Sequence, residues 1–158
     1  MKKILFVDFC NELIDFIKKN DVDKLIIDLR FNGGGDSGLL TKFIDKIVNI
    51  KKINKYGHLF TFIGEKTFSS AVLNALYLKK NTKAMLVGHP SSGSPNHFGE
   101  VKQFLLPSTG LIVSYSTKYF FTIDVKSDTL YPDKYIEYNF NDFINGIDPA
   151  YGFVKKYW

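Results

Sequence analysis

Cysteine and histidine are scarce in this chain of 158 residues. Cys10 is the single cysteine, so the sequence provides neither a disulfide framework nor a thiolate metal cluster. The three histidines are widely separated and lack the spacing of a zinc site. We therefore expect no metal and no cofactor. Cys10 falls within the apolar pattern of a helix and is interpreted as a buried structural thiol.

Long apolar runs are also missing. No stretch reaches the ~18 consecutive apolar residues of a membrane-spanning helix. Residues 4–7 form an apolar run too short for the core of a signal peptide, and no small-residue cleavage site follows it. The chain as written is therefore expected to stay in the cytoplasm, whereas a longer precursor would allow a location outside it.

Arginine is nearly absent, although the formal net charge is +5. Arg30 is the only arginine, and arginine dominates the bidentate recognition of bases and phosphates. The lysines form scattered pairs, such as Lys18-Lys19 and Lys79-Lys80, rather than one basic patch. The composition therefore argues against a nucleic-acid partner.

Apolar periodicity predicts alternating helices and strands in the first half of the chain. Helices are predicted over residues 6–17, 37–50 and 70–80, and strands over residues 24–29, 58–63 and 83–87. Antiparallel strands are predicted over residues 100–106, 111–116 and 119–125, followed by a helix around Asp142 and another after Pro149. This order predicts one domain over residues 1–158. Its fold is an α/β layered fold, with a parallel-rich sheet, helical crossovers and an antiparallel section in the second half.

A run of three glycines, Gly33-Gly34-Gly35, follows the first predicted strand. Glycines adopt backbone conformations closed to other residues, and amides that enter a helix N-terminus favour negative charge. The run has neither the GxxxxGK[ST] nor the GxGxxG spacing of nucleotide-binding loops. We interpret it as an oxyanion hole, with a tight structural turn as the alternative.

Ser69 stands at the entrance to the predicted helix 70–80. A serine in this position often caps the helix through its hydroxyl. It can instead act as a nucleophile whose oxyanion product is stabilised by nearby amides. Taken alone, the residue leaves both interpretations open.

These two turns belong to a longer ordered set of segments. The segments are LIIDLRFNGGG at 25–35, TFSSA at 67–71, AMLVGHPSSG at 84–93, YPD at 131–133 and GIDP at 146–149. The set resembles the conserved elements of the tail-specific, or carboxy-terminal processing, serine peptidases. The order and spacing hold from about Leu25 to Asp148. The resemblance implies a ClpP/crotonase-like α/β fold and cleavage of extended polypeptides near a C-terminus.

The resemblance also implies roles for individual residues. It places the nucleophile on Ser69, with Ser70 as the alternative if the turn is shifted by one residue. One oxyanion amide falls on Ser70 and the other on Gly34 or Gly35. The implied partner is a polypeptide substrate, which would be hydrolysed through an acyl-enzyme.

The general base departs from the family pattern. Many relatives have a lysine where this chain has Ser94, and a serine cannot act as a base at neutral pH. His97 is the nearest candidate, because an imidazole can accept a proton near neutral pH. The alternative is a loop histidine that bonds to backbone or water. Lys80 is the less favoured candidate.

The second departure is at the N-terminus. Full-length relatives carry an N-terminal helical part and often a PDZ domain, whereas this chain begins one helix before the glycine turn. A homo-oligomer or a missing N-terminal domain would then complete the protein. A non-catalytic peptide-binding or assembly domain on the same fold is the main alternative function. An acyl-thioester enzyme of the crotonase type is a third, although nothing in the sequence accounts for recognition of its nucleotide-like cofactor.

Overall fold

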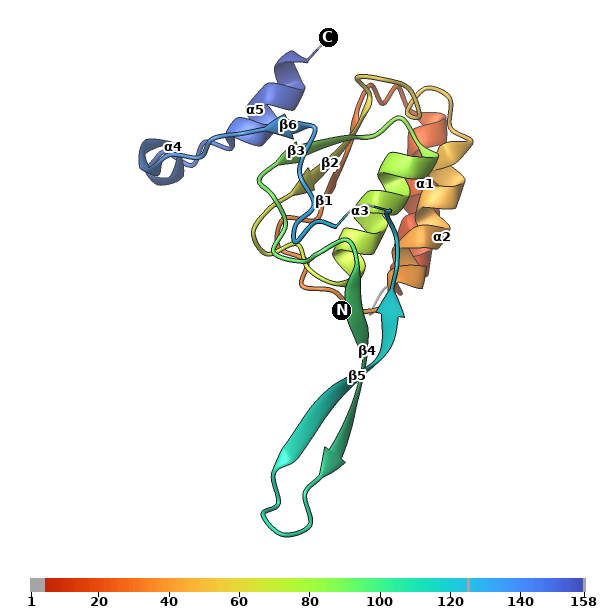
Figure 1. The fold of residues 1–158 in the computed structure, drawn as a ribbon. Coiled ribbons are helices and arrows are strands. Elements are labelled where there is room, and N and C mark those ends of the chain that lie inside the picture. The colour runs from red at the N-terminus through yellow and green to blue at the C-terminus, as the bar shows by residue number, and fades with distance from the viewer. Residues whose placement is uncertain (1–4, 125, 158) are drawn as a thin grey trace.

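The protein is described by a computed structural model that covers residues 5–124 and 126–157 (Figure 1). The helices are α1 (Phe6–Lys19), α2 (Ser37–Val48), α3 (Ser70–Asn81), α4 (Phe140–Ile144) and α5 (Pro149–Lys156). The strands are β1 (Leu25–Asp28), β2 (Leu59–Ile63), β3 (Met85–Gly88), β4 (His97–Leu105), β5 (Ile112–Phe120) and β6 (Lys134–Tyr135). None of the described helices is both long enough and apolar enough to cross a membrane.

The central sheet is parallel, with the strand order β1-β2-β3-β6. Side chains alternate between its two faces because a strand has a period of two residues. Leu59 packs in a core with α1 and α2, whereas Phe60 packs against α5. Helices α1, α2 and α3 lie together on one side of the sheet in Figure 1, and α5 lies on the other. The α/β fold expected from the sequence is confirmed, including its parallel sheet.

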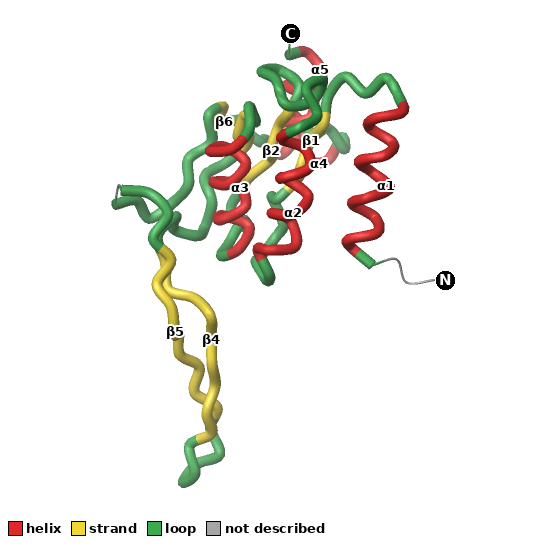
Figure 2. The backbone as a smooth tube through the Cα atoms, turned by 90° about the vertical axis from the view of Figure 1, so that its right-hand side faces the viewer, coloured by secondary structure: helices red, strands yellow, loops and turns green. Residues whose placement is uncertain are grey.

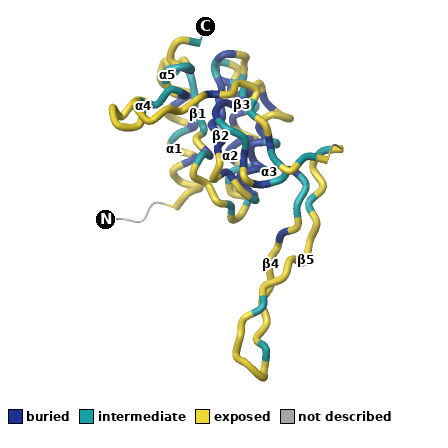
Figure 3. The backbone as a smooth tube through the Cα atoms, turned by 60° about the vertical axis from the view of Figure 1, so that its left-hand side comes forward, coloured by how far each residue is buried: buried dark blue, intermediate teal, exposed yellow. Residues whose placement is uncertain are grey.

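A long antiparallel hairpin, β4–β5, extends away from this layered body (Figure 2). Figure 3 shows that most of the hairpin is exposed. The prediction of separate strands at 111–116 and 119–125 is wrong, because β5 runs unbroken to Phe120. Thr117 stays in the strand, and its hydroxyl donates to the Glu100 carbonyl oxygen at 2.7 Å. Val125, where the predicted strand ended, lies outside the described residues.

Strand β6 was not predicted, because two residues carry no apolar pattern. It forms through parallel pairing with the end of β3, where Lys134 is in register with Val87 and Tyr135 with Gly88. The amide of Ile136 also donates to the Gly88 carbonyl oxygen at 3.0 Å. This pairing joins residues almost fifty positions apart, which local propensity cannot anticipate.

Gly88 is a position where the fold requires glycine. Its φ is 126°, and a Cβ there would lie 2.2 Å from the Ile63 carbonyl oxygen. Gly88→Ala is therefore expected to lower the free energy of unfolding by at least roughly 1–3 kcal/mol, from backbone strain alone. Gly152→Ala is the matched control, because Gly152 lies in α5 with no atom within 4 Å of an added Cβ. We expect the control to be neutral or more stable in urea unfolding; equal midpoints for the two variants would contradict this account.

Candidate active site

Ser69 begins α3 in an unusual backbone conformation, with φ 50° and ψ −121°. A positive φ is uncommon for a residue with a Cβ and stores strain, which is found most often at functional sites. Its side chain makes no capping hydrogen bond to the helix. The turn therefore resembles the strained strand-to-helix turn that presents a nucleophilic serine, rather than an ordinary N-cap.

Thr67 holds this turn against the end of β1. The side chain is fully buried, and its hydroxyl donates to the Leu29 carbonyl oxygen at 2.8 Å. The same hydroxyl accepts a hydrogen bond from the amide of Gly64 at 2.9 Å. One residue later, the amide of Phe68 donates to the Asn32 carbonyl oxygen at 3.1 Å. These bonds connect the serine turn to the glycine turn.

The glycine turn lies directly against Ser69. Gly34 and Gly35 have φ values of 114° and 131°, which other residues rarely adopt. A Cβ on Gly34 would lie 2.8 Å from the Cβ of Ser69 and 3.3 Å from its Oγ. A Cβ on Gly33 would meet no atom within 4 Å, so the close approach is specific to Gly34. The structure thus brings the two turns together.

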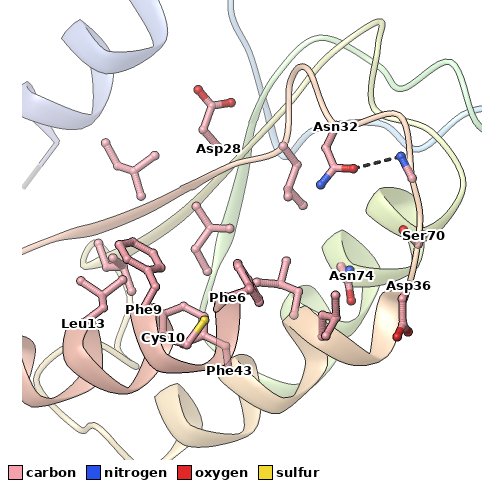
Figure 4. A pocket seen from close by; sticks show the side chains of 17 residues that line it. Phe6, Phe9, Cys10, Leu13, Asp28, Asn32, Asp36, Phe43, Ser70 and Asn74 are labelled. Carbon is pink, nitrogen blue, oxygen red and sulfur yellow. Dashed lines mark hydrogen bonds between the residues drawn. The ribbon is translucent and has the colours of Figure 1, made fainter. Parts of the chain in front are cut away.

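Three backbone amides near Ser69 are candidate oxyanion donors. The amide of Gly34 donates to the Asn32 side-chain oxygen at 2.9 Å, as the dashed line in Figure 4 shows. The amides of Gly35 and Ser70 make no hydrogen bond with any described residue. The Ser70 amide also lies in the first turn of α3, where the helix dipole is positive. The amides of Gly35 and Ser70 are therefore available to stabilise an anion next to Ser69, whereas the amide of Gly34 would have to exchange its bond to Asn32 for one to the anion.

His97 lies at the start of β4, with Nδ1 2.8 Å from the Ser94 carbonyl oxygen. A carbonyl oxygen only accepts, so this contact places the proton on Nδ1 and leaves Nε2 as an acceptor. Nε2 is buried and has no hydrogen-bond partner among the described residues. The ring stacks on Phe120, with ring centroids 5.5 Å apart. Within residues 5–124 and 126–157, no hydrogen bond joins His97 to Ser69.

The loop before β4 packs beside the serine turn. A Cβ on Gly93 would lie 3.2 Å from the Cα of Phe68. The Ser94 hydroxyl lies 2.8 Å from the Asn96 carbonyl oxygen and 2.6 Å from the Ser127 carbonyl oxygen, and it donates its single proton between these two acceptors. Ser94 therefore shapes the loop that carries His97. Lys80 lies near the opposite end of α3, roughly 16 Å along the helix axis from Ser69.

Arg30 connects the end of β1 to the C-terminal part of the chain. Its guanidinium contacts Asp28 at 2.6 Å and Asp148 at 2.8 Å, and it lies 4.8 Å from the centre of the Phe62 ring. Asp36, the other carboxylate close in sequence, is not a partner of Arg30. Asp36 instead accepts a hydrogen bond from the amide of Gly38 and caps α2. The Arg30 ion pairs stabilise the segment that leads into the glycine turn.

The pKa of Asp148 gives this ion pair a measurable signature. Burial alone would raise that pKa, but hydrogen bonds from Arg30 and from the amides of Tyr151 and Ala150 outweigh it and lower the pKa. A carboxyl with a lowered pKa stabilises the folded state above its ordinary pKa near ~3.9. That contribution is lost as the pH falls through the lower, folded-state value.

We therefore expect wild type to lose more stability than Asp148→Asn between pH 5 and pH 2, where the carboxyl becomes protonated. Urea midpoints measured across this range would show the difference. Parallel curves for the two proteins would mean that the ionised carboxyl does not contribute.

Sequence reasoning missed Thr67 and Asn32, although it located both turns. The Thr67 hydroxyl donates to the Leu29 carbonyl oxygen, 38 positions away in the sequence, whereas the Asn32 side chain accepts a local hydrogen bond from the amide of Gly34. An asparagine two residues before a glycine is a known signal for a side-chain-to-backbone turn, so Asn32 was open to detection. Thr67 stands in the TFSSA segment that resembles the peptidases, but that resemblance did not indicate its hydrogen bond to Leu29.

Comparisons with solved structures identify proteins of the same fold. A Bacteroides fragilis protein assigned to the S41 proteases matches 95% of this chain, with a TM-score of 0.60 and 16% identity. A Parabacteroides merdae protein assigned as a peptidase also matches 95%, with a TM-score of 0.63 and 14% identity. The photosystem II D1 C-terminal processing protease matches 84%, with a TM-score of 0.54 and 16% identity.

The chain spans 46%, 55% and 39% of the lengths of these three structures. Neither a protein-family model nor a curated protein sequence matches it. Identities this low establish the fold alone, and they confirm at that level the resemblance seen in the sequence. The described chain therefore has the α/β core fold of the S41 and carboxy-terminal processing proteases.

Proposed function

We propose that this chain is the core of a serine endopeptidase that hydrolyses extended polypeptides through an acyl-enzyme. The observation that carries the proposal is the contact between Ser69 and Gly34. A strained serine without a capping bond lies against a glycine turn, and two amides beside it have no partner among the described residues. This combination matches the requirements of nucleophilic attack on a carbonyl.

In the proposed first step, Ser69 Oγ attacks the carbonyl carbon of the scissile peptide bond. The oxyanion that forms would accept hydrogen bonds from the Ser70 amide and from Gly34 or Gly35. The proton of the hydroxyl passes to the base and then to the leaving amine as the C–N bond breaks. Water then attacks the acyl carbon and gives its proton to the same base. The bond between the acyl carbon and Ser69 Oγ breaks, the base returns the proton to Oγ, and the second product leaves with a free carboxylate.

His97 is the proposed base, because Nδ1 is held by a backbone carbonyl and Nε2 is free to accept a proton. His97→Ala is expected to lower kcat by about 10²–10⁴-fold, the usual contribution of a general base. The fold should survive, which circular dichroism and the urea midpoint would verify. Ser94→Ala is the control for disturbance of the same loop. An unchanged kcat in His97→Ala would remove His97 from the mechanism.

The main alternative is a peptide-binding domain without catalysis, since the lysine of many relatives is replaced by Ser94. Incubation of the chain with an unfolded polypeptide such as reduced casein separates the two functions. New N-termini identified by mass spectrometry would support hydrolysis. Saturable binding with no new termini, over hours and at high enzyme concentration, would support the binding domain and overturn the peptidase proposal.

A further inference from the structure

The side chain of Asn32 occupies the backbone amide of Gly34 (Figure 4). Its side-chain oxygen accepts this hydrogen bond at 2.9 Å, from the residue two positions later in the sequence. Such a bond from an asparagine to the nearby backbone forms an Asx-turn. Because Gly34 lies against Ser69, the bond occupies one of the candidate oxyanion donors.

The backbone of Asn32 is fixed independently of its side chain. Its amide donates to the Leu29 carbonyl oxygen at 3.1 Å, and its carbonyl oxygen accepts from the amide of Phe68 at 3.1 Å. The residue is exposed, so its carboxamide can exchange the bond to Gly34 for one to water at little cost. The side chain can therefore release the Gly34 amide while the glycine turn and the serine turn stay joined.

The acceptors that compete for the Gly34 amide differ in charge. The Asn32 carboxamide oxygen and the carbonyl oxygen of a bound peptide are both neutral, and the Asn32 oxygen is already in place. An oxyanion is a charged acceptor, and charge-assisted hydrogen bonds are roughly twice as strong as neutral ones. The amide is therefore expected to stay with Asn32 beside a neutral carbonyl and to move to that oxygen once charge develops on it.

We propose that Asn32 is a positioning residue that holds the Gly34 amide in the resting enzyme and yields it to the oxyanion. The inference rests on the peptidase function proposed above and on Gly34 as one of the oxyanion donors. A donor that is withheld from the neutral carbonyl contributes to the transition state and not to the affinity for the peptide. Asn32 thereby raises KM through Gly34, without touching the substrate.

Two substitutions of Asn32 separate this competition from a purely structural turn. Asn32→Ala removes the competing acceptor, so KM should fall about threefold to tenfold, the effect of one neutral hydrogen bond, with kcat within a few-fold of wild type. Asn32→Asp keeps the turn, but its carboxylate holds the amide more strongly and repels the oxyanion. Its kcat/KM should fall at least about tenfold below wild type in the hydrolysis of a quenched fluorescent peptide. A purely structural role predicts the opposite order, because aspartate forms the same turn and alanine does not.

Asn139→Asp is the matched control for the added charge. The side-chain oxygen of Asn139 also accepts a hydrogen bond from a backbone amide, that of Asp142 at 2.9 Å, but it does so at the N-cap of α4. Both kcat and KM of this variant should match those of wild type.

The amide proton of Gly34 provides a readout that does not require turnover. In chains that contain ¹⁵N-labelled glycine, its NMR resonance is identified by its loss in Gly34→Ala. We expect this resonance to differ between wild type and Asn32→Ala in the unmodified chains. It should coincide once both carry a fluorophosphonate adduct on Ser69, because the phosphoryl oxygen is then the acceptor in both.

Equal resonances in the two unmodified chains, or an Asn32→Asp variant at least as active as Asn32→Ala, would overturn the proposal. Adducts whose Gly34 resonances still differ, in a chain that hydrolyses peptides, would contradict the exchange alone. A wild-type chain that neither hydrolyses peptides nor forms an adduct would contradict the peptidase function, and the exchange with it.

Discussion

Ser69→Ala is expected to lower kcat for peptide hydrolysis by at least about 10⁴-fold, because the variant lacks the hydroxyl that lies against Gly34 in the strained turn. The KM should change little, since the amides of the oxyanion site remain. Hydrolysis of a quenched fluorescent peptide would measure both constants. The variant should also gain some stability, because alanine removes a partly buried hydroxyl that makes no capping bond.

Two serine variants serve as controls for this result. Ser114→Ala changes an exposed hydroxyl on β5, where Ser114 is in register with Gln103 of the hairpin, and should leave kcat unchanged. Ser70→Ala keeps the backbone amide and removes only the side-chain hydroxyl, so it should retain most of kcat. Loss of all activity in Ser70→Ala, with full activity in Ser69→Ala, would mean that the turn is shifted by one residue and that Ser70 is the nucleophile.

Gly34→Ala is expected to lower kcat by about 10²–10³-fold, the usual effect of losing an oxyanion donor. The added Cβ would lie 2.8 Å from the Cβ of Ser69, and alanine is strained at a φ of 114°. Both effects move the donor and the nucleophile apart. Because the change lies at the surface end of the sheet, the urea midpoint should fall much less than in Gly88→Ala.

Gly33→Ala is the matched control for this substitution. The residue is the immediate neighbour of Gly34, yet an added Cβ there meets no atom within 4 Å, and its φ lies outside the left-handed region. Its kcat should stay within a few-fold of wild type. Similar losses in both variants would show that the glycine turn matters for flexibility in general rather than for its contact with Ser69.

The positions of the two turns could be predicted from the sequence. The carboxyl ends of neighbouring parallel strands meet at one edge of a sheet, so the turns that follow β1 and β2 lie side by side. The apolar runs that define these strands are local features, as is the periodicity of α2 and α3. For the same reason, the helix that starts at Ser70 was placed correctly from its sequence.

The remaining features depend on contacts between distant parts of the chain. Arg30 pairs with Asp148 across 118 positions, and Thr67 reaches the Leu29 carbonyl across 38. The short strand β6 and the continuous strand β5 are likewise determined by their partners. The orientation of His97 depends on the Ser94 carbonyl, a loop contact with no signature in residue type. Local patterns therefore predict the framework of the site but not the bonds that orient its side chains.

The assignment of Ser69 as the nucleophile is tested most directly by covalent modification with a fluorophosphonate. The modified residue would be identified by tryptic digestion and mass spectrometry. Such a reagent forms a stable phosphonyl ester only with a serine whose hydroxyl is activated and whose neighbouring amides bind the phosphoryl oxygen. We expect one adduct per chain on Ser69, and its loss in both Ser69→Ala and Gly34→Ala. A chain that remains unmodified, or an adduct spread over exposed serines such as Ser114, would contradict the assignment of Ser69 as an activated nucleophile.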